Sequence, residues 1–390
     1  MKKRSVEIAV SVEYSREWGR KVCEGIAAYA QLQPGWHLSM FKNGLSNAAA
    51  LKQFDGFLWG ISDARTALAL KATGRPIVDL FGLDVSIGGI TGVGVDHAAC
   101  GELAAQTFIS HQFRNFAYFG WKDLPHSRHR QLPYVQALER ANYKCHTYLS
   151  SALTTLQYLR THVWREQLEL PSDARAIGRW VAKLPKPVGV FCANDMRAWQ
   201  LAEICRNEGI RVPGDVAIVG VDNDPIFCLF SSLSLSSVDT NSFEIGRRAA
   251  EVLDGLMAGD RTLFERDIRI EPIGVVNRSS TAVYPVDPSW LGDILVHIRT
   301  NVADALTADD IAAYAGKSYG TVENAFKRVL HTTVQKEIMS ARLDAAEHLL
   351  KTTVMPIGEI AARAGFKSAR YFNHCFAARH HQSPGHWRAG

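Results

Sequence analysis

The sequence predicts an α/β body of two lobes followed by an all-α domain with two helix-turn-helix units. Over roughly the first 280 residues, short β-rich apolar runs alternate with longer amphipathic stretches, which is typical of parallel sheets covered by helices. This length exceeds one mononucleotide-type sheet and suffices for two lobes. Beyond Ser289 the apolar residues recur only at helical spacing, in two similar copies.

The elements of the body follow from these periodicities. Strands are expected at Val6–Val12, Gly56–Trp59, Pro76–Phe81, Gly92–Val95, Phe116–Phe119, Val188–Phe191 and Val216–Val221. Helices are expected at Gly19–Gln31, Ala98–Gln112, Arg175–Lys183, Met196–Glu208 and Phe243–Ala258, because apolar residues recur there at i, i+3 and i+4.

The composition excludes several classes of protein. With 47% apolar and 21% charged residues among 390, the chain is neither disordered nor fibrous. Its best apolar stretch, Val216–Val221, is far shorter than the roughly 20 residues of a membrane span, so no membrane partner is expected. The apolar run after the basic start breaks at Glu7, which indicates a strand and not an export signal. Seven cysteines without a Cys-x-x-Cys pair indicate reduced thiols and a cytoplasmic location.

A break in the pattern separates two domains. Val276–Ser289 collects turn and linker residues without periodicity, so we expect a body at 1–283, a linker at 284–289 and a helical domain at 290–390. From Ile311 onward, eleven Lys and Arg face five Asp and Glu, a net charge of +6 against +5 for the whole chain. The end of the chain is therefore a basic module on a nearly neutral body.

The helical domain contains an internal repeat. Ile311–Gly316 and Ile360–Gly365 share the pattern Ile-Ala-Ala-x-Ala-Gly. After one inserted residue in the second copy, Phe366, the match continues at Ser318/Ser368, Phe326/Phe376, His331/His381 and Thr333/Ser383. Each copy predicts a short helix ending at a glycine, a turn, and a second helix with a serine N-cap and a buried aromatic. A single such pair would more often be plain packing, but two copies on a basic module favour DNA-binding helix-turn-helix units at about 309–331 and 358–381.

The spacing of the copies agrees with this interpretation. The helix that joins them, about Val334–Lys351, would be roughly 27 Å long. Two recognition helices at about that separation can enter successive major grooves, whose repeat distance is about 34 Å.

The second copy reads Ile360-Ala-x-x-x-Gly365-Phe366-x-Ser368-x-x-Tyr371-Phe372-x-x-x-Phe376, then Ser383-Pro384-x-x-Trp387-Arg388, and the joining helix contains Arg342-Leu343-x-x-Ala346-x-x-Leu349-Leu350. These segments resemble the DNA-binding signature and linker helix of AraC-type transcription regulators. The sequence departs from that family at two places. His331 and His381 stand where the family usually has glycine, and Ala377 and Ala378 stand where it has two basic residues. The first predicts altered turns after the recognition helices, and the second predicts weaker phosphate contact by the second unit.

The body carries a second resemblance. Val190–Asp195 reads Val-Phe-Cys-Ala-Asn-Asp, Val212–Asn223 reads Val-Pro-Gly-Asp-Val-Ala-Ile-Val-Gly-Val-Asp-Asn, and Ser236–Asp239 reads Ser-Ser-Val-Asp. These segments resemble the effector domain of LacI-type repressors, which is similar to periplasmic sugar-binding proteins. A sensor of this kind before an AraC-type domain is similar to the xylose operon regulator group. The resemblance implies a two-lobed, periplasmic-binding-protein-like sensor.

A sugar site can be predicted at the strand ends of that sensor. Sugar hydroxyls both donate and accept, so a dry site needs Asp and Asn as acceptors and Arg as a multiple donor. Ligands of open α/β sheets lie beyond the carboxyl ends of strands, and several Asp and Asn residues follow expected strands. For any one of them a helix-capping role is equally plausible. The predicted sugar-binding residues are Tyr14, Asp96, Arg130, Asn194, Asp195, Asp222 and Asn223.

Three of these residues carry further expectations. Arg130 matches the ligand-contacting arginine of the resembled family, although Arg128 competes for that role. Tyr14 either stacks on a sugar face or packs on the first helix. The substitution Asp222→Ala is expected to abolish sugar-dependent stabilisation and to leave the empty fold intact, because no buried partner is assigned to Asp222.

DNA contacts can be predicted from the buried aromatics of the two copies. The residues two and six positions before each aromatic share an exposed helical face, namely Asn324 and Gly320, then His374 and Arg370. Arg370 can donate twice to guanine and Asn324 can pair with adenine, although Arg370 could instead grip phosphate. The predicted DNA-binding residues are Ser318, Tyr319, Thr321, Asn324, Lys327, Arg328, Ser368, Arg370, Asn373 and His374.

These features predict a cytoplasmic, sugar-responsive transcription regulator that, by resemblance, senses a pentose such as xylose and controls sugar-utilisation genes. Its expected partners are a double-stranded DNA operator, a small sugar and a second copy in a homodimer through the N-terminal lobe, with RNA polymerase as a further candidate. No metal, cofactor or catalytic residue is expected. The alternative is a cytosolic sugar-processing α/β enzyme with a helical appendage. However, the glycine-rich Gly88–Gly94 leads into a strand, so it does not form a phosphate loop.

Overall fold

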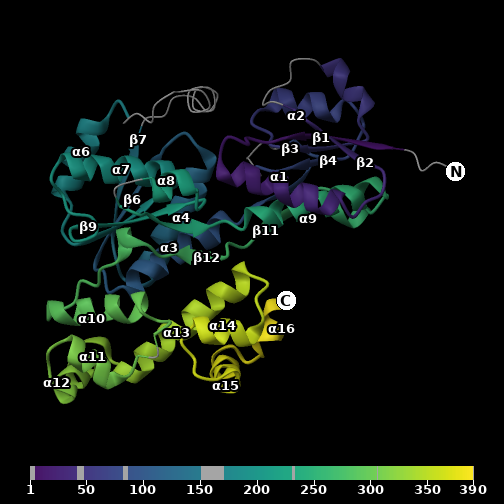
Figure 1. Cartoon of the computed structure of the whole chain (residues 1–390). Coiled ribbons are helices and arrows are strands. Elements are labelled where there is room, and N and C mark those ends of the chain that lie inside the picture. Colours follow the sequence, from purple (N-terminus) through teal and green to yellow (C-terminus); the bar gives the residue numbers. More distant parts are fainter. Residues whose placement is uncertain are drawn as a thin grey trace. The chain divides into compact units, whose positions relative to one another are not determined.

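The computed structural model describes residues 5–41, 48–81, 87–150, 171–230, 233–304 and 306–389, and divides the chain into two compact units (Figure 1). The first unit comprises Met1–Phe108 and Arg114–Thr281, and the second comprises Ile109–Phe113 and Ala282–Gly390. The first unit is α/β and the second is helical, which confirms the predicted fold class. No helix in these described ranges is long and apolar enough to cross a lipid bilayer.

The first lobe of the α/β unit is built on a parallel sheet with the strand order β11-β5-β4-β3-β1-β2. Its strands are β1 (Val6–Ser11), β2 (Trp36–Met40), β3 (Gly56–Trp59), β4 (Ile77–Asp79), β5 (Thr91–Val95) and β11 (Asp267–Ile270). Its helices are α1 (Glu17–Ala30), α2 (Ala64–Lys71) and α9 (Ser242–Met257), with a 3-10 turn at Ala48–Gln53. A Cβ on Gly25 would lie 1.9 Å from the Phe243 carbonyl oxygen, so glycine is required where α1 crosses α9.

The second lobe has a sheet with the order β12-β10-β9-β8-β6-β7, parallel except for the antiparallel pair β10 and β12. Its strands are β6 (Asn115–Trp121), β7 (Cys145–Ser150), β8 (Val188–Cys192), β9 (Val216–Val221), β10 (Ser236–Asp239) and β12 (Gly274–Val276). The helices of this part of the chain are α3 (His97–Ser110), α4 (Pro125–Arg140), α6 (Ala174–Lys183), α7 (Asp195–Asn207) and α8 (Pro225–Leu229). β8 and β9 are buried throughout, as expected for central parallel strands.

The predicted strands and helices of the body are all present. Four of the five strands missed by the sequence share a position, and the fifth, β10, lies between β9 and β12 within the second sheet. β2, β7, β11 and β12 are the edge strands of the two sheets. An edge strand has one neighbour and tolerates polar residues, so its apolar pattern is weak. The short helices α2 and α8 were also missed, as was α4, which is rich in polar residues and contains Pro133.

The helical unit contains two helix-turn-helix pairs. Its helices are α10 (Ser289–Thr300), α11 (Ala308–Tyr314), α12 (Tyr319–Ala325), α13 (Val334–Thr352), α14 (Ile357–Arg363), α15 (Ala369–His380) and α16 (Pro384–Ala389). A π-helical turn, Phe326–Leu330, continues α12. The start of α13 packs into the core around Phe326, and its end packs into the core around Phe376. The joining helix therefore fixes the two pairs relative to each other.

The turns that follow the recognition helices keep the glycine-type conformation. His331 ends the first pair with φ 55°, and His381 ends α15 with φ 58°. The left-handed region favours glycine, so histidine holds each turn at a cost in strain. The expectation that the missing glycines alter the turns is therefore wrong for the backbone conformation.

The segment expected to be irregular between the domains is built into both units. Its start forms β12, and Ser280 donates to the Ile218 carbonyl of β9 at 2.6 Å. Tyr284, the first residue of the predicted linker, is buried in the core of the helical unit, and Ser289 begins α10. The segment lacks a periodic apolar pattern, yet its buried side chains pack into the two units.

Candidate ligand and DNA-binding sites

Arg130 on α4 is the centre of a polar cluster in the α/β unit. Its guanidinium is buried and donates to the Ala193 carbonyl at 2.6 Å, to Asp222 Oδ1 at 3.1 Å and to His97 Nδ1 at 3.2 Å. Burial and the adjacent guanidinium hold the pKa of His97 well below its usual range, so His97 is neutral and can accept this hydrogen bond. Arg128 is exposed, so of the two competing arginines the structure brings only Arg130 to the strand ends.

Asp222 lies directly after β9, where the backbone turns with φ 103°. Burial raises the pKa of its carboxyl, and the ion pair with Arg130 opposes this shift. The assumption that Asp222 has no buried partner in the empty protein is therefore wrong. Removing its charge would leave the Arg130 guanidinium buried and uncompensated.

Two of the predicted residues cap helices. Asn194 accepts from the Arg197 amide at 3.0 Å at the start of α7, and Asp96 accepts from the Ala99 amide at 2.9 Å at the start of α3. Both caps lie beside the Arg130 cluster, because Asn194 follows Ala193 and Asp96 precedes His97. The capping role therefore holds for both residues.

Asp195 and Asn223 are engaged within the protein. Asp195 is 1% exposed; its Oδ2 accepts from the Asp224 amide at 2.7 Å, and its Oδ1 is directed at Gly220 of β9. Asn223 donates to Asp239 at 3.0 Å and accepts from Arg278 at 2.6 Å. The carboxyl of Asp195 therefore faces the sheet, and the amide of Asn223 ties β9 to the chain that returns after β12.

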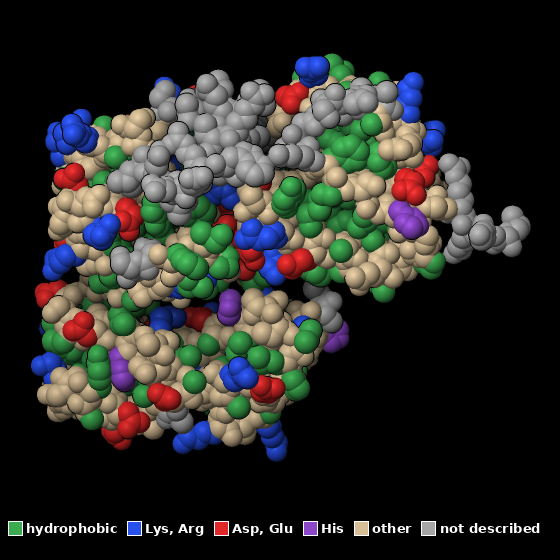
Figure 2. Space-filling model, turned by 45° about the horizontal axis from the view of Figure 1, so that its top comes forward, with side chains coloured by type: hydrophobic (Ala, Val, Ile, Leu, Met, Phe, Trp, Pro, Cys, Tyr) green, Lys and Arg blue, Asp and Glu red, His purple; other side chains and the backbone are tan. Residues whose placement is uncertain are grey.

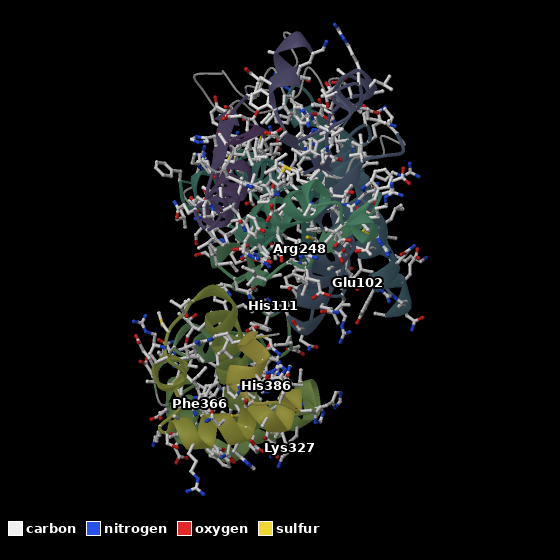
Figure 3. The ribbon with its side chains drawn as sticks, turned by 90° about the vertical axis from the view of Figure 1, so that its right-hand side faces the viewer. Glu102, His111, Arg248, Lys327, Phe366 and His386 are labelled. Carbon is white, nitrogen blue, oxygen red and sulfur yellow. The ribbon has the colours of Figure 1, made fainter. Side chains whose placement is uncertain are left out.

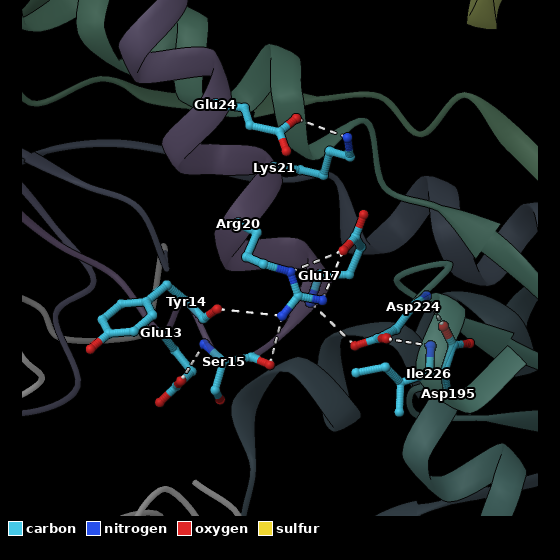
Figure 4. Close-up of polar contacts among 10 residues, drawn as sticks. All are labelled: Glu13, Tyr14, Ser15, Glu17, Arg20, Lys21, Glu24, Asp195, Asp224 and Ile226. Atoms are coloured by element: carbon cyan, nitrogen blue, oxygen red, sulfur yellow. Dashed lines mark hydrogen bonds and ion pairs between the residues drawn. The ribbon is translucent and has the colours of Figure 1, made fainter. Parts of the chain in front are cut away.

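The lobes meet through the segment that follows β1 (Figure 4). The Glu17 amide of the first lobe donates to Asp224 Oδ2 of the second lobe at 3.2 Å. Arg16 lies over the Phe227 ring at 5.2 Å, which adds a cation–π contact between the lobes. Tyr14, two residues earlier, is 46% exposed, and its carbonyl accepts from Arg20. Its ring is thus open at this junction and is not buried against α1.

Sequence reasoning missed an aromatic pair at the strand ends of the first lobe. Trp18 at the start of α1 and Phe81 after β4 have ring centroids 5.5 Å apart. Gly60, after β3, leaves room for Phe81, since a Cβ there would lie 2.7 Å from the ring. The sequence placed Phe81 inside an expected strand, Pro76–Phe81, whereas β4 ends at Asp79, so its position at the strand end was not recognised.

The predicted DNA-binding residues all lie at the surface of the helical unit. The exposed ones are Ser318, Tyr319, Thr321, Asn324, Lys327, Arg328, Ser368, Arg370, Asn373 and His374. Ser318 and Ser368 are N-caps of the second helices, accepting from Thr321 and Tyr371. Phe326 and Phe376 are fully buried. The residues two and six positions before each of them therefore lie on the outward face of the helix.

The charge of the helical unit is not uniform. Figure 2 shows both Lys or Arg and Asp or Glu side chains on its visible face. Lys327 pairs with Glu323 at 3.3 Å, whereas the described Arg370 is exposed on α15. The basic excess is therefore partly neutralised by neighbours within the unit.

The comparisons with known proteins agree with this architecture. Residues 105–281 match the periplasmic binding protein-like domain family, and residues 311–390 match a helix-turn-helix domain family. The chain is 25% identical to the Xylose operon regulatory protein of Haemophilus influenzae, an alignment that covers 100% of this chain and 99% of that protein. Its counterpart in Escherichia coli K12 is 24% identical and is aligned over 96% of this chain and 94% of its own length. The chain thus has the make-up of a transcription regulator, in which a periplasmic binding protein-like domain precedes a helix-turn-helix domain.

A structural likeness covers the same length. The solved structure of the xylose-binding transcription activator xylR aligns with the regulator with a TM-score of 0.61 at 22% identity, covering 100% of this chain and 99% of that one. The two proteins therefore share a fold over this length. The alternative of a sugar-processing enzyme is not supported, because these relatives are transcription regulators.

Proposed function

We propose that the regulator senses a small sugar, a pentose such as xylose, and controls sugar-utilisation genes. The observation that carries this proposal is the polar cluster at the strand ends of the second lobe, where Arg130 donates to both the Ala193 carbonyl and Asp222. The cap residue Asn194 directly follows Ala193. The names of the full-length relatives support a pentose, and their identities of 25% and 24% leave the choice of sugar to experiment.

The residues at the strand ends match the chemistry of a sugar. The second lobe offers a guanidinium with several donors, a carboxylate and an amide, and these groups can pair with hydroxyls that donate and accept. The first lobe offers the Trp18 and Phe81 rings, and an aromatic face suits the C–H side of a sugar ring. A ligand held between these groups would favour the closed arrangement of the lobes, because only that arrangement supplies both sets of contacts.

Thermal shift and calorimetry with a panel of pentoses and hexoses test the ligand. A sugar bound by the folded state alone raises the unfolding temperature in proportion to RT ln(1 + [L]/Kd). We expect the largest shift with a pentose, and a smaller shift in Phe81→Ala. Arg75→Ala, a variant of an exposed arginine paired with Asp55 at 3.9 Å, is the control and should keep the shift. Absence of any shift across the panel would contradict the sugar-sensing proposal.

The DNA-reading proposal assigns base contacts to Arg370 and Asn324. Both side chains are exposed on recognition helices whose opposite faces are buried. A base-reading Arg370 should, on replacement by alanine, cost about 1 to 3 kcal/mol at one operator position and relax specificity there. Binding to an operator library at two salt concentrations measures this effect. Uniform weakening across sequences, with a lower salt slope, would assign Arg370 to phosphate instead.

The homodimer, the cytoplasmic location and the contact with RNA polymerase are parts of the same proposal. Apolar side chains are exposed on α8 and at Phe230, which directly follows α8 and is 87% exposed. These side chains support association through the sensor. They lie in the second lobe, whereas the sequence led us to expect pairing through the N-terminal lobe. Sedimentation at micromolar concentration with Phe230→Glu and Leu32→Glu, a first-lobe control, separates the two surfaces. A monomeric wild-type protein would rule out both.

A further inference from the structure

Helix α3 begins at the candidate sugar site. His97, its first residue, accepts a hydrogen bond from Arg130 Nε at 3.2 Å. One turn later, a Cβ on Gly101 would lie 2.6 Å from the Arg130 carbonyl oxygen and 2.9 Å from the Tyr134 amide nitrogen. Such close backbone packing leaves no space for α3 to slide against α4. The start of α3 and the Arg130 guanidinium therefore move together.

The other end of α3 leads into the helical unit. The five residues Ile109–Phe113, which directly follow Phe108, group with that unit and not with the sensor. Among them, His111 (labelled in Figure 3) is buried, and its ring stacks on Tyr284 with centroids 4.4 Å apart and planes inclined by 30°. A helix of 14 residues is about 21 Å long, so α3 is a rigid rod between its two ends.

Tyr284 is in turn fixed to α10. A Cβ on Gly292 of α10 would lie 2.3 Å from the Tyr284 carbonyl oxygen. The Tyr284 side chain is buried in the same core as Leu291 and Leu295. Any displacement of Tyr284 is therefore transmitted to α10.

Ion pairs connect α10 to the second recognition helix. Arg299 of α10 pairs with Glu337 at 3.0 Å and with Asp344 at 2.9 Å, both on α13. Asp344 also pairs with Arg379 of α15 at 2.7 Å. One carboxylate thus holds guanidinium groups from two helices, and α15 is the helix that carries Arg370.

We propose that the His111–Tyr284 stack couples the sugar site to the DNA-reading helices. A ligand-dependent shift of Arg130 moves α3 and His111, and the movement reaches α15 through Tyr284, α10 and Asp344. This inference rests on the proposed sugar-sensing function and names how that site regulates DNA binding. Coupling between binding sites is reciprocal, so operator DNA must act back on α3 through the same contacts.

The first test measures how far xylose changes operator affinity in the full-length protein. Allosteric factors of about 5- to 150-fold are typical, and we expect His111→Ala to reduce the wild-type factor to near one. The variant should still bind sugar by calorimetry and should still bind operator without sugar. His111→Phe keeps an aromatic face and should retain most of the factor. Val181→Ala, a truncation in the core of the second lobe, controls for lost stability and should leave the factor unchanged.

The second test separates failure of the coupling from failure of the sugar proposal. Hydrogen exchange with and without operator DNA should show added protection of α3 amides in the wild type and none in His111→Ala. If xylose changes wild-type operator affinity, an equal factor in His111→Ala overturns the coupling. Equal DNA-dependent protection of α3 in both proteins overturns it too. If no sugar alters wild-type operator affinity but the protection difference is seen, the coupling stands and the sugar proposal fails. If DNA protects α3 in neither protein, the coupling is refuted as well.

Discussion

Replacing Asp222 tests whether the site is held together before any ligand binds. The Arg130 and Asp222 side chains are 4% and 22% exposed and their charged atoms lie 3.1 Å apart. Removing one partner of a buried pair costs about 3 to 5 kcal/mol, because the other charge loses its compensation. Arg130 keeps its hydrogen bonds to Ala193 and His97, so we expect the lower end, about 3 kcal/mol, for Asp222→Ala.

The isosteric variant separates charge from hydrogen bonding. Asp222→Asn keeps an oxygen acceptor for Arg130, and asparagine tolerates the positive φ at this position. We expect a loss of about 1 to 2 kcal/mol, smaller than for alanine. Both variants should also weaken sugar-dependent stabilisation, since each removes the carboxylate charge offered to the ligand.

Urea denaturation followed by circular dichroism measures the free energy of unfolding, and thermal shift measures the sugar effect. Glu102→Ala is the control, because the pair of Glu102 with Arg140 is exposed on both sides and should contribute less than about 1 kcal/mol. The reasoning is refuted if Asp222→Ala is as stable as Glu102→Ala. An Asn variant less stable than the Ala variant would also refute it.

The remaining predictions concern turns and titration. His331→Gly and His381→Gly should each stabilise the helical unit by about 0.5 to 1 kcal/mol in thermal denaturation, because glycine adopts their left-handed conformation without strain. Gly365→Ala should destabilise it by about 2 kcal/mol or more, since a Cβ at φ 79° would lie 2.1 Å from a carbonyl oxygen of the loop after α10. Gly320→Ala meets open space and should not destabilise. Burial, with help from the Arg130 charge, lowers the pKa of His126 from 6.5 to about 3, so the folded state binds fewer protons than the unfolded state below pH 6.5. Stability should therefore fall as pH drops from 6.5 toward 3, by at most about 1.4 kcal/mol per pH unit, and His126→Gln should flatten this slope in urea denaturation.

Much of the candidate site could be predicted because the apolar runs in the sequence indicate where the strands end. Asp222 and Asn194 follow fully buried apolar runs, so their placement at the sheet edge depends only on strands that the period already indicates. Arg130 was predicted by resemblance with Arg128 left open, and burial separates the two. Asp195 shows the limit of this reasoning: it has the same position after a strand as Asn194, yet its carboxyl faces the sheet.

The sequence by itself determined the class of each domain, most of the central strands, the repeated helix pairs and the outward faces of the recognition helices. These features are local, because periodicity, caps and turn residues act over a few positions along the chain. Only the tertiary structure decided the edge strands, the Arg130–Asp222 pair, the Trp18–Phe81 contact and the stack of His111 on Tyr284. Each joins residues that are distant in the sequence, and such contacts depend on how the elements pack, which no local pattern records.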